Sequence, residues 1–577
     1  MSVRFVSQAV LAALLLGACL HWMADAGPCP TAPYGPSSFG DAQWNGDING
    51  DCSLDIGDAI ALLGYLFSGG PPPAAFAGGS GLTPTEISVV QELGQHMTVV
   101  FLPDGQGGTV KTIRFSGVNL QVVNGLGATN GYPTDDASED PMLTQTNGLG
   151  NLIVGYNELD PMNANDRTGS HSIVCGYRND YASFGGLVAG RENDVTGSCA
   201  TVSGGKRGVA SGTNASVTGG FLNVASGGES CVSGGRENQA TTDVTSVSGG
   251  RNNVASAFWS SVSGGLDNHA SGEYSSVCGG RLNDASGSIS TILGGQDNMA
   301  TATDSCVSGG AGNVASGGQS AVSGGSGNVA SGVQSSVTGG GQNVASGTQS
   351  SVAGGQANQA VSRFCSAVGG IQNVAGLVGQ VDALVYATVS GGESNLASGQ
   401  SSSVSGGRFG DATGARSSIS GGNDGLASGE YSSVQGGDGC IASGGVASVS
   451  GGFQNEAQGG SSSVLGGRSN QAGANFSCIS GGENNQATGL FAAVSGGSFG
   501  TASGNWASVC GGNSNSATGV HCAVLGGDGN TAGSGTSTVS GGFNNQALGG
   551  ASSVSGGQNH TVSGDYDWQG GGLFQDN

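Results

Sequence analysis

A branched apolar residue, almost always valine, returns every fifteen residues along most of the chain. Twelve copies run from Val202 to Ala367, and after a seven-residue insertion twelve more run from Val389 to Val554. Numbered from this residue, positions 3 and 4 are glycine in every copy, and position 9 is alanine in all but the last. A disordered glycine- and serine-rich chain has no reason to keep such a register, whereas stacked coils must keep one. The sequence therefore predicts an all-β solenoid.

Two positions of the repeat are predicted to turn the chain. Position 7 is usually asparagine, as at Asn223 and Asn253, and four of its six exceptions are glycine. Asparagine and glycine both tolerate positive φ, so we predict a left-handed corner here rather than a row of ligands. The glycine common at position 11, as at Gly272, marks the second corner. Two corners leave two short strands, which predicts a flattened parallel β-roll whose 24 coils extend about 115 Å.

The core of such a roll is thin. Each coil would bury one valine and one alanine, while ordering its backbone costs roughly 1–2 kcal/mol per residue. We therefore expect further small-residue surface to be buried by rolls that pack side by side, which predicts an oligomer.

The repeats resemble those of a known family. The stretches "SVSGGRNNVAS" and "ASGEYSSVCGG" are similar to the head repeats of YadA-type trimeric autotransporter adhesins, over residues 202–557 and more loosely over 152–191. The resemblance implies a left-handed roll, a homotrimer and adhesion to an extracellular matrix protein or polysaccharide. We assign residues 151–557 to the roll and 558–577 to a C-terminal cap.

The N-terminus carries an export signal. One positive charge at Arg4 precedes an apolar run, and "ADA" ends at Ala26, so residues 1–26 read as a signal peptide. Cleavage before Cys19 as a lipoprotein is the alternative. The chain is therefore expected to be secreted or held at the cell surface, and no other segment is long and apolar enough for a transmembrane helix. A net charge of −24 is the wrong sign for coating nucleic acid.

A calcium loop is predicted within residues 27–78. Alternating oxygen-bearing residues fall at positions 1, 3, 5, 7, 9 and 12 of one loop, the spacing that folds ligands around Ca²⁺: Asp47, Asn49, Asp51, Ser53, Asp55 and Asp58. The stretch resembles the calcium-binding repeat of type I dockerins. It departs from them in having a single loop, with Cys52 where glycine is usual. A helix-capping turn without metal is the alternative.

Residues 79–150 are predicted to form a small adaptor that covers the first coil. Thr83, Pro84 and Glu86 make a capping box, so a short helix is expected to begin here. Three segments rich in valine and isoleucine follow and predict strands at 97–103, 109–116 and 118–124.

Position 13 is the most variable place in the repeat and carries aromatic residues. These rings are predicted either to bind sugars or a protein or to brace the roll: Trp259, Tyr274, Phe364, Tyr431, Phe476, Phe491 and Trp506. Several cysteines replace serine or alanine in the repeat and are expected to be small buried thiols: Cys231, Cys278, Cys306, Cys478 and Cys510. Cys29 and Cys52 are the pair with most reason to form a disulfide.

No catalytic constellation emerges from the sequence. The histidines lie far apart, and abundant serine is no evidence of nucleophilic catalysis without a positioned base. The sequence thus predicts a non-catalytic structural or adhesive rod that binds calcium. Two alternatives stay open: a dockerin-like binding subunit of an extracellular assembly, and a polysaccharide-active β-helix protein.

Overall fold

The computed structural model describes residues 84–138, 143–161, 165–571 and 573–575. They divide into two compact units, one ending at Gln121 and one beginning at Val122. The predicted signal peptide, the calcium loop and the Cys29–Cys52 pair lie outside the described residues. Within the part of the chain that is described, no helix is long and apolar enough to cross a membrane.

The first unit contains a helix and a β-hairpin. Helix α3 (Pro84–His96) begins at the predicted proline, and strands β1 (Met97–Pro103) and β2 (Thr109–Phe115) pair in antiparallel register. The helix and these two strands confirm the prediction. The strand expected at 118–124 is not formed, because these residues find no partner strand and the Asn124 amide donates to Nε2 of His171 instead (3.1 Å).

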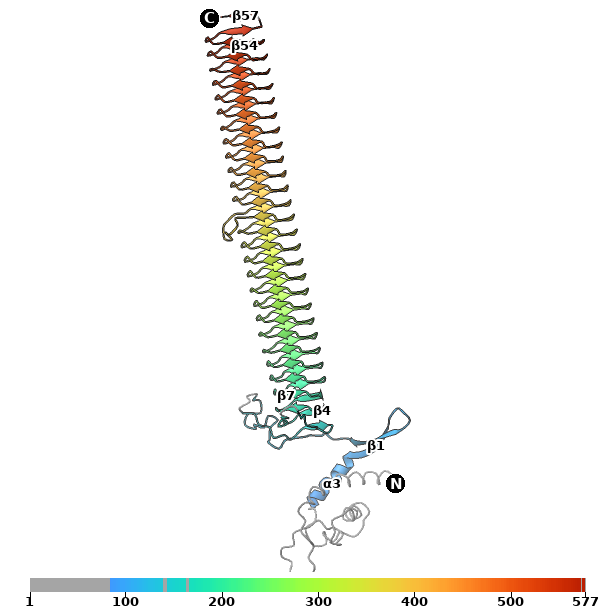
Figure 1. Cartoon of the computed structure of the whole chain (residues 1–577). Coiled ribbons are helices and arrows are strands. Elements are labelled where there is room, and N and C mark those ends of the chain that lie inside the picture. Colours follow the sequence, from blue (N-terminus) through green and yellow to red (C-terminus); the bar gives the residue numbers. More distant parts are fainter. Residues whose placement is uncertain (1–83, 139–142, 162–164, 572, 576–577) are drawn as a thin grey trace, which may run out of the picture. The chain divides into compact units, whose positions relative to one another are not determined.

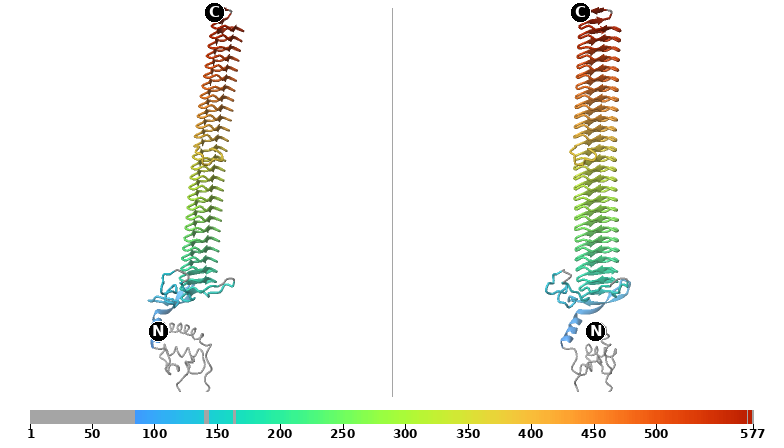
Figure 2. Two further views of the ribbon diagram at one scale, coloured as in Figure 1. Left: turned by 90° about the vertical axis from the view of Figure 1, so that its left-hand side faces the viewer. Right: turned by 60° about the vertical axis from the view of Figure 1, so that its left-hand side comes forward.

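The second unit is a parallel β-solenoid of about 27 turns. From β8 (Thr201–Val202) and β9 (Val209–Ala210) to β52 (Thr538–Val539) and β53 (Gln546–Ala547), every strand has two residues. Even-numbered strands occupy positions 15 and 1 and form one parallel ladder; odd-numbered strands occupy positions 8 and 9 and form a second. Figures 1 and 2 show the coils stacked in a single column. The parallel roll with two strands per coil is confirmed.

A third line of contact runs along position 5. Single parallel bridges join this position from coil to coil, as in Lys206 to Phe221 and Phe221 to Arg236. A fourth line runs along position 13, where the backbone amide donates to the position 12 carbonyl of the preceding coil, as Tyr274 does to Phe258 (2.9 Å). Each coil is therefore hydrogen-bonded to its neighbour at four places on its circumference, which fixes the rotation of one coil on another.

The first coils have fourteen residues each, and comparing them with later coils shows which residue is added to make fifteen. Val174, Val188 and Val202 are fourteen residues apart, and β4 (Ile173–Tyr177) and β6 (Leu187–Arg191) run unbroken for five residues. In later coils the added residue is the glycine at position 3. It interrupts the strand, so only two residues and the position 5 bridge remain.

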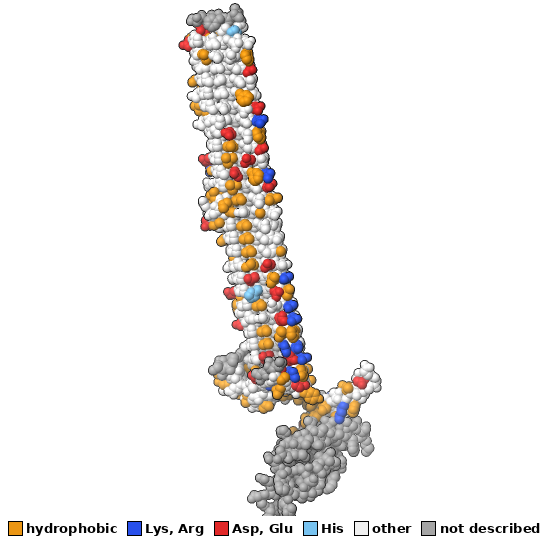
Figure 3. Space-filling model, viewed as in Figure 1, with side chains coloured by type: hydrophobic (Ala, Val, Ile, Leu, Met, Phe, Trp, Pro, Cys, Tyr) orange, Lys and Arg blue, Asp and Glu red, His pale blue; other side chains and the backbone are white. Residues whose placement is uncertain are grey.

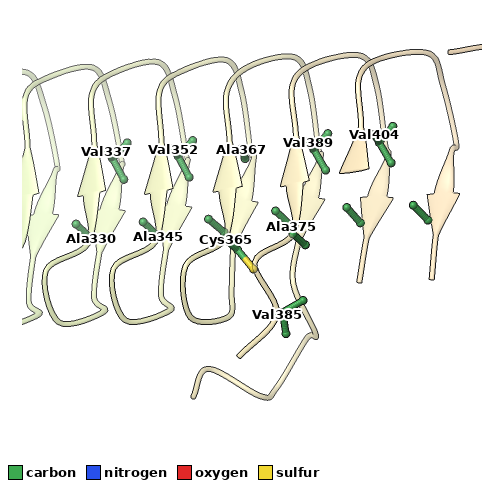
Figure 4. Close-up of a cluster of buried hydrophobic side chains, with 14 of the residues drawn as sticks. Ala330, Val337, Ala345, Val352, Cys365, Ala367, Ala375, Val385, Val389 and Val404 are labelled. Carbon is green, nitrogen blue, oxygen red and sulfur yellow. The ribbon is translucent and has the colours of Figure 1, made fainter. Parts of the chain in front are cut away.

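The core consists of the two predicted columns. The position 1 residues and the position 9 alanines are 0–1% exposed throughout the repeats. Figure 4 shows these columns around the segment 376–387, which contains the seven-residue insertion and loops out of the stack. Val385 of the insertion packs inward near Cys365, and the ladder resumes when Ala367 pairs with Val389.

The predicted left-handed corner at position 7 is wrong. Positive φ occurs at positions 4, 6 and 13, and the position 7 asparagines are not among these residues. Asn328 instead points inward and is fully buried. Its Nδ2 donates to Gly324 O (2.8 Å) and to Gly340 O of the next coil (3.0 Å), and its Oδ1 accepts from the Asn343 amide (3.0 Å). The column is a buried ladder that ties consecutive coils together.

The solenoid ends on a short reversal of the chain. Strand β56 (Trp568–Gly570) pairs in parallel with β54 (Ser553–Gly556), and β57 (Leu573–Gln575) turns back on it in antiparallel register. The Trp568 indole donates to Ser555 Oγ (2.7 Å). At this end the ladder of even-numbered strands is therefore extended by one antiparallel strand.

Candidate functional site

The position 13 aromatics form an edge of stacked rings. Each has φ near +60°, a conformation that costs a bulky residue roughly 1–2 kcal/mol. The longest stack joins Phe476, Phe491, Trp506 and His521, with centroids 4.7, 4.0 and 5.7 Å apart. Stacking at about 0.5–1.5 kcal/mol per pair offsets much of the backbone strain.

The other aromatics of the edge form smaller groups. Trp259 and Tyr274 stack with Phe258 at their edges, and Phe364 stacks on Tyr386 at 4.9 Å. Tyr431 stands apart, with the Arg416 guanidinium over its ring. Most of these rings are about half exposed. Because neighbouring rings already cover each other's faces, a sugar could stack only at the end of each group.

His521 and Tyr386 belong to this edge and were missed by sequence analysis. Both stand three residues before the next position 1 residue, as the seven predicted aromatics do. The signal that finds them is any planar side chain, histidine included, three residues before a position 1 residue, in the interrupted coil as well as in the regular ones.

The outward face of the even-numbered strands carries no charge. We call it the serine face: the outward side chains at positions 15 and 2, together with the glycine at position 3. In all 24 copies positions 15 and 2 hold only Ser, Thr, Cys, Ala, Val, Leu or Gln. The outward column at position 8 on the other sheet, by contrast, includes Asp284, Asp411 and Glu456.

The prediction of small buried thiols is wrong for the five cysteines named in it, although three others of the repeat are buried: Cys365, Cys440 and Cys522. Cys278, Cys478 and Cys510 are exposed, and Cys231 and Cys306 are half-buried. Positions 15 and 2 alternate with the buried position 1, so their side chains point away from the core. Together with Cys175, six free thiols lie on the serine face or its continuation into the first coils.

Serine, histidine and aspartate side chains come together at positions 10 and 8 of three consecutive coils. His269 Nε2 lies 3.4 Å from Ser256 Oγ, and Asp284 is the partner of His269 in the next coil. The amides of Ser256, His269 and Ser271 all donate to carbonyls of the following coil, so none of them is available to stabilise an oxyanion. The sequence does not show this group directly, because His269 and Asp284 are fifteen residues apart and meet only when the coils stack.

The described residues include no group of three or more His, Cys, Asp or Glu side chains able to hold a metal ion. The predicted calcium ligands at 47–58 lie outside these residues, so the calcium site stays a prediction.

Two carboxylates stack in the first coils. Asp180 and Asp194 are partners in neighbouring strands, and Arg167 Nε lies 3.7 Å from Asp180 Oδ1. Burial raises the pKa of Asp194 to about 6, with Asp180 and Asp166 adding to the shift. Burial also raises the pKa of Asp180, although Arg167 opposes this. Ionising Asp194 in the folded state is therefore unfavourable.

We expect replacement of Asp194 with asparagine to remove a pH dependence from the first coils. Because the pKa of Asp194 is raised on folding, the carboxyl costs nothing near pH 3, where it is protonated in both states. Stability is lost as pH rises from about 4 to about 6, by at most about 3 kcal/mol before solvent screening. Amide hydrogen exchange of residues 173–202 should show the Asp194→Asn variant more protected than wild type at pH 7. The two should match near pH 3, and equal protection at both pH values would contradict the assignment.

No family model matches the chain, and no curated protein matches it significantly. The fold therefore identifies the class only: a β-solenoid built of coils of about 15 residues.

Proposed function

We propose that the chain is an exported, non-catalytic rod that associates with copies of itself through the serine face and acts as a structural or adhesive element outside the cell. The observation that carries this proposal is an uncharged face that continues through 24 coils of a protein with a net charge of −24. Two further features of that face support it.

The first feature is the glycine at position 3. A Cβ built on Gly324, and on most other members of this column, would meet no heavy atom within 4 Å. Only Gly541 and Gly556 of the column have positive φ. Neither backbone conformation nor crowding within one chain thus explains why the residue is glycine in every copy. Close approach of a second molecule explains it, because a side chain here would hold the two faces apart.

The second feature is the chemistry of the exposed side chains. Free thiols on a solvent-exposed surface are reactive, and an exported chain meets oxidising conditions. Leucines at position 2 are also exposed in one chain, Leu465 by 58%. A face that combines thiols, leucines and hydroxyls without charge suits burial against an equally flat, uncharged surface. A second copy supplies such a surface in the same register.

Three parts of the proposal rest on the sequence. The resemblance to trimeric adhesin heads favours three chains and a matrix protein or polysaccharide as ligand. The signal peptide favours secretion or the cell surface. The dockerin-like loop favours one Ca²⁺ per chain, bound by residues 47–58.

The proposal is tested by the native mass of the mature chain. Light scattering or native mass spectrometry should give a multiple of the chain mass, and the resemblance to trimeric adhesin heads implies three times that mass. If calcium acts only in the N-terminal loop, the multiple should be the same after chelation. Calorimetric titration of the full chain should show one calcium site. A monomer at micromolar concentration would refute self-association, and absence of calcium uptake would refute the loop assignment alone.

A further inference from the structure

Seven of the fifteen basic residues of the chain lie along one edge of the solenoid. We call it the basic edge: Arg178, Arg191, Lys206, Arg207, Arg236, Arg251 and Arg281. They occupy positions 5 and 6, or the equivalent places in the first coils, and Figure 3 shows Lys and Arg side chains gathered along the edge in its lower part. Three carboxylates share these positions between residues 178 and 282, so the edge keeps an excess of four positive charges.

The position 5 bridges hold these residues in a straight line. They join Arg191, Lys206, Phe221, Arg236, Arg251, Leu266 and Arg281 in seven consecutive coils. At ~4.8 Å per coil, the row from Tyr177 to Arg281 is about 34 Å long. Cations at every one or two steps of a regular ladder form a strip, one to two side chains wide.

Aromatic rings keep the cations spread along this strip. The guanidinium groups of Arg178 and Arg191 lie 4.7 and 5.5 Å from the Tyr177 ring, and Lys206 and Arg236 flank Phe221 at 5.8 and 5.4 Å. A cation over a ring keeps its outer N–H groups directed to solvent. The edge is thus ordered before any ligand arrives, which lowers the entropy cost of binding.

Internal carboxylates neutralise the edge only in part. Glu192 contacts Arg191 and Arg207 at 2.8 Å and Lys206 at 3.8 Å, and Glu237 contacts Arg236 at 3.0 Å and Arg251 at 3.8 Å. The five cations remain 38–60% exposed, whereas the Glu192 side chain is only 5% exposed. Glu192 lies beneath its three cations and aligns them, whereas Glu237 is 31% exposed. With the cations this exposed, their outer N–H groups stay available for an external anion.

We propose that the basic edge binds the carboxylate or sulfate groups of an extended acidic polysaccharide that runs along the solenoid. Such a chain presents its anions in single file, as the edge presents its cations, and guanidinium groups pair with both anions through two parallel hydrogen bonds. A nucleic acid duplex is wider than the strip, so many of its phosphates would lie beyond the cations of the edge, on a chain whose net charge is −24. The inference rests on the adhesive role proposed above, because it assigns that role a ligand class and a surface, and it does not depend on self-association.

The test uses the full mature chain, with heparin as the sulfated probe, polygalacturonate as the carboxylated probe and duplex DNA as the competitor. The triple variant Arg236→Gln, Arg251→Gln, Arg281→Gln should lose about tenfold or more in affinity for the acidic polysaccharides. It should also show a shallower salt dependence, because fewer counterions are released. Its native mass should equal that of wild type, which keeps this test separate from the test of self-association.

Arg408→Gln with Arg468→Gln is the matched control. Both residues stand at position 5 of later coils, where each contacts one glutamate and has no basic residue at position 5 of the neighbouring coils. This variant should bind as wild type does. The proposal is overturned if neither polysaccharide binds wild type at physiological salt, if the control loses as much affinity as the triple variant, or if DNA binds more tightly and depends on the same three arginines.

Discussion

Replacing Gly325 with alanine is expected to disrupt the solenoid locally, while the same replacement at its neighbour Gly324 leaves the fold of the chain unchanged. Gly325 stands at position 4 with φ +86°, and an added Cβ would overlap the carbonyl oxygen of Gly340 in the next coil. It would also lie 2.5 Å from the side-chain nitrogen of Asn328, which belongs to the buried asparagine ladder. Positive φ alone costs an alanine about 1–3 kcal/mol, and a lost buried hydrogen bond about as much again.

The local disruption in the Gly325→Ala variant should make thermal unfolding of the solenoid less cooperative. Because each coil contacts only its neighbours, a defect of about 2–6 kcal/mol in the middle of the stack separates it into two parts. We expect a new protease-sensitive site near residues 325–340 and a second transition in thermal unfolding followed by circular dichroism. Gly324→Ala should show neither, but should weaken association if position 3 lies in the interface. A Gly325→Ala chain that unfolds like wild type would mean that coils do not stack at this distance.

Placing charges on the serine face is expected to convert the oligomer to a monomer. The variant carries Ser323→Asp, Ser405→Asp and Ser480→Asp, three exposed position 2 residues spaced along the face. Each carboxylate buried in a flat, uncharged interface without a partner costs several kcal/mol, and aspartates of neighbouring chains in the same register repel each other. Affinity should fall by at least about a hundredfold, which is under 3 kcal/mol in total. The measurement is native mass against concentration.

The control places the same charges on the opposite sheet. Ser316→Asp, Thr413→Asp and Ser503→Asp are exposed position 10 residues, so they add the same charge at equivalent depth. This control should keep the wild-type mass. If both variants dissociate, net charge rather than the serine face governs association; if neither does, the interface lies elsewhere.

The candidate surfaces could be predicted from the sequence only where composition alone marks them. The position 13 aromatics stand out in the sequence, yet their stacking on each other does not, because it depends on φ near +60° turning every ring along the column. The basic edge escaped notice because its residues mix with Phe221 and Leu266 at position 5 and join only when coils stack. The serine face escaped notice because serine is abundant everywhere.

At position 7 the exchange of asparagine with glycine was recognised correctly, but the backbone conformation inferred from it was wrong. Exchange of asparagine with glycine at position 7 suggested positive φ, but both residues fit there for another reason. Asparagine fills the inner corner with three hydrogen bonds, and where glycine replaces it at Gly500, the backbone amide still donates to Asn485 Oδ1 (2.8 Å). A glycine there ends the side-chain ladder without disturbing the backbone.

The sequence by itself determined the period, the columns that fill the core and the parallel stacking, because each coil meets the same local constraints and any shift of register would expose its valine. Only the tertiary structure decided which glycine is obligatory and which is free, which asparagine groups meet the next coil, and which side chains share an outer face. These properties depend on the direction of each residue around the coil and on contacts with residues fifteen positions away, neither of which a residue type alone specifies.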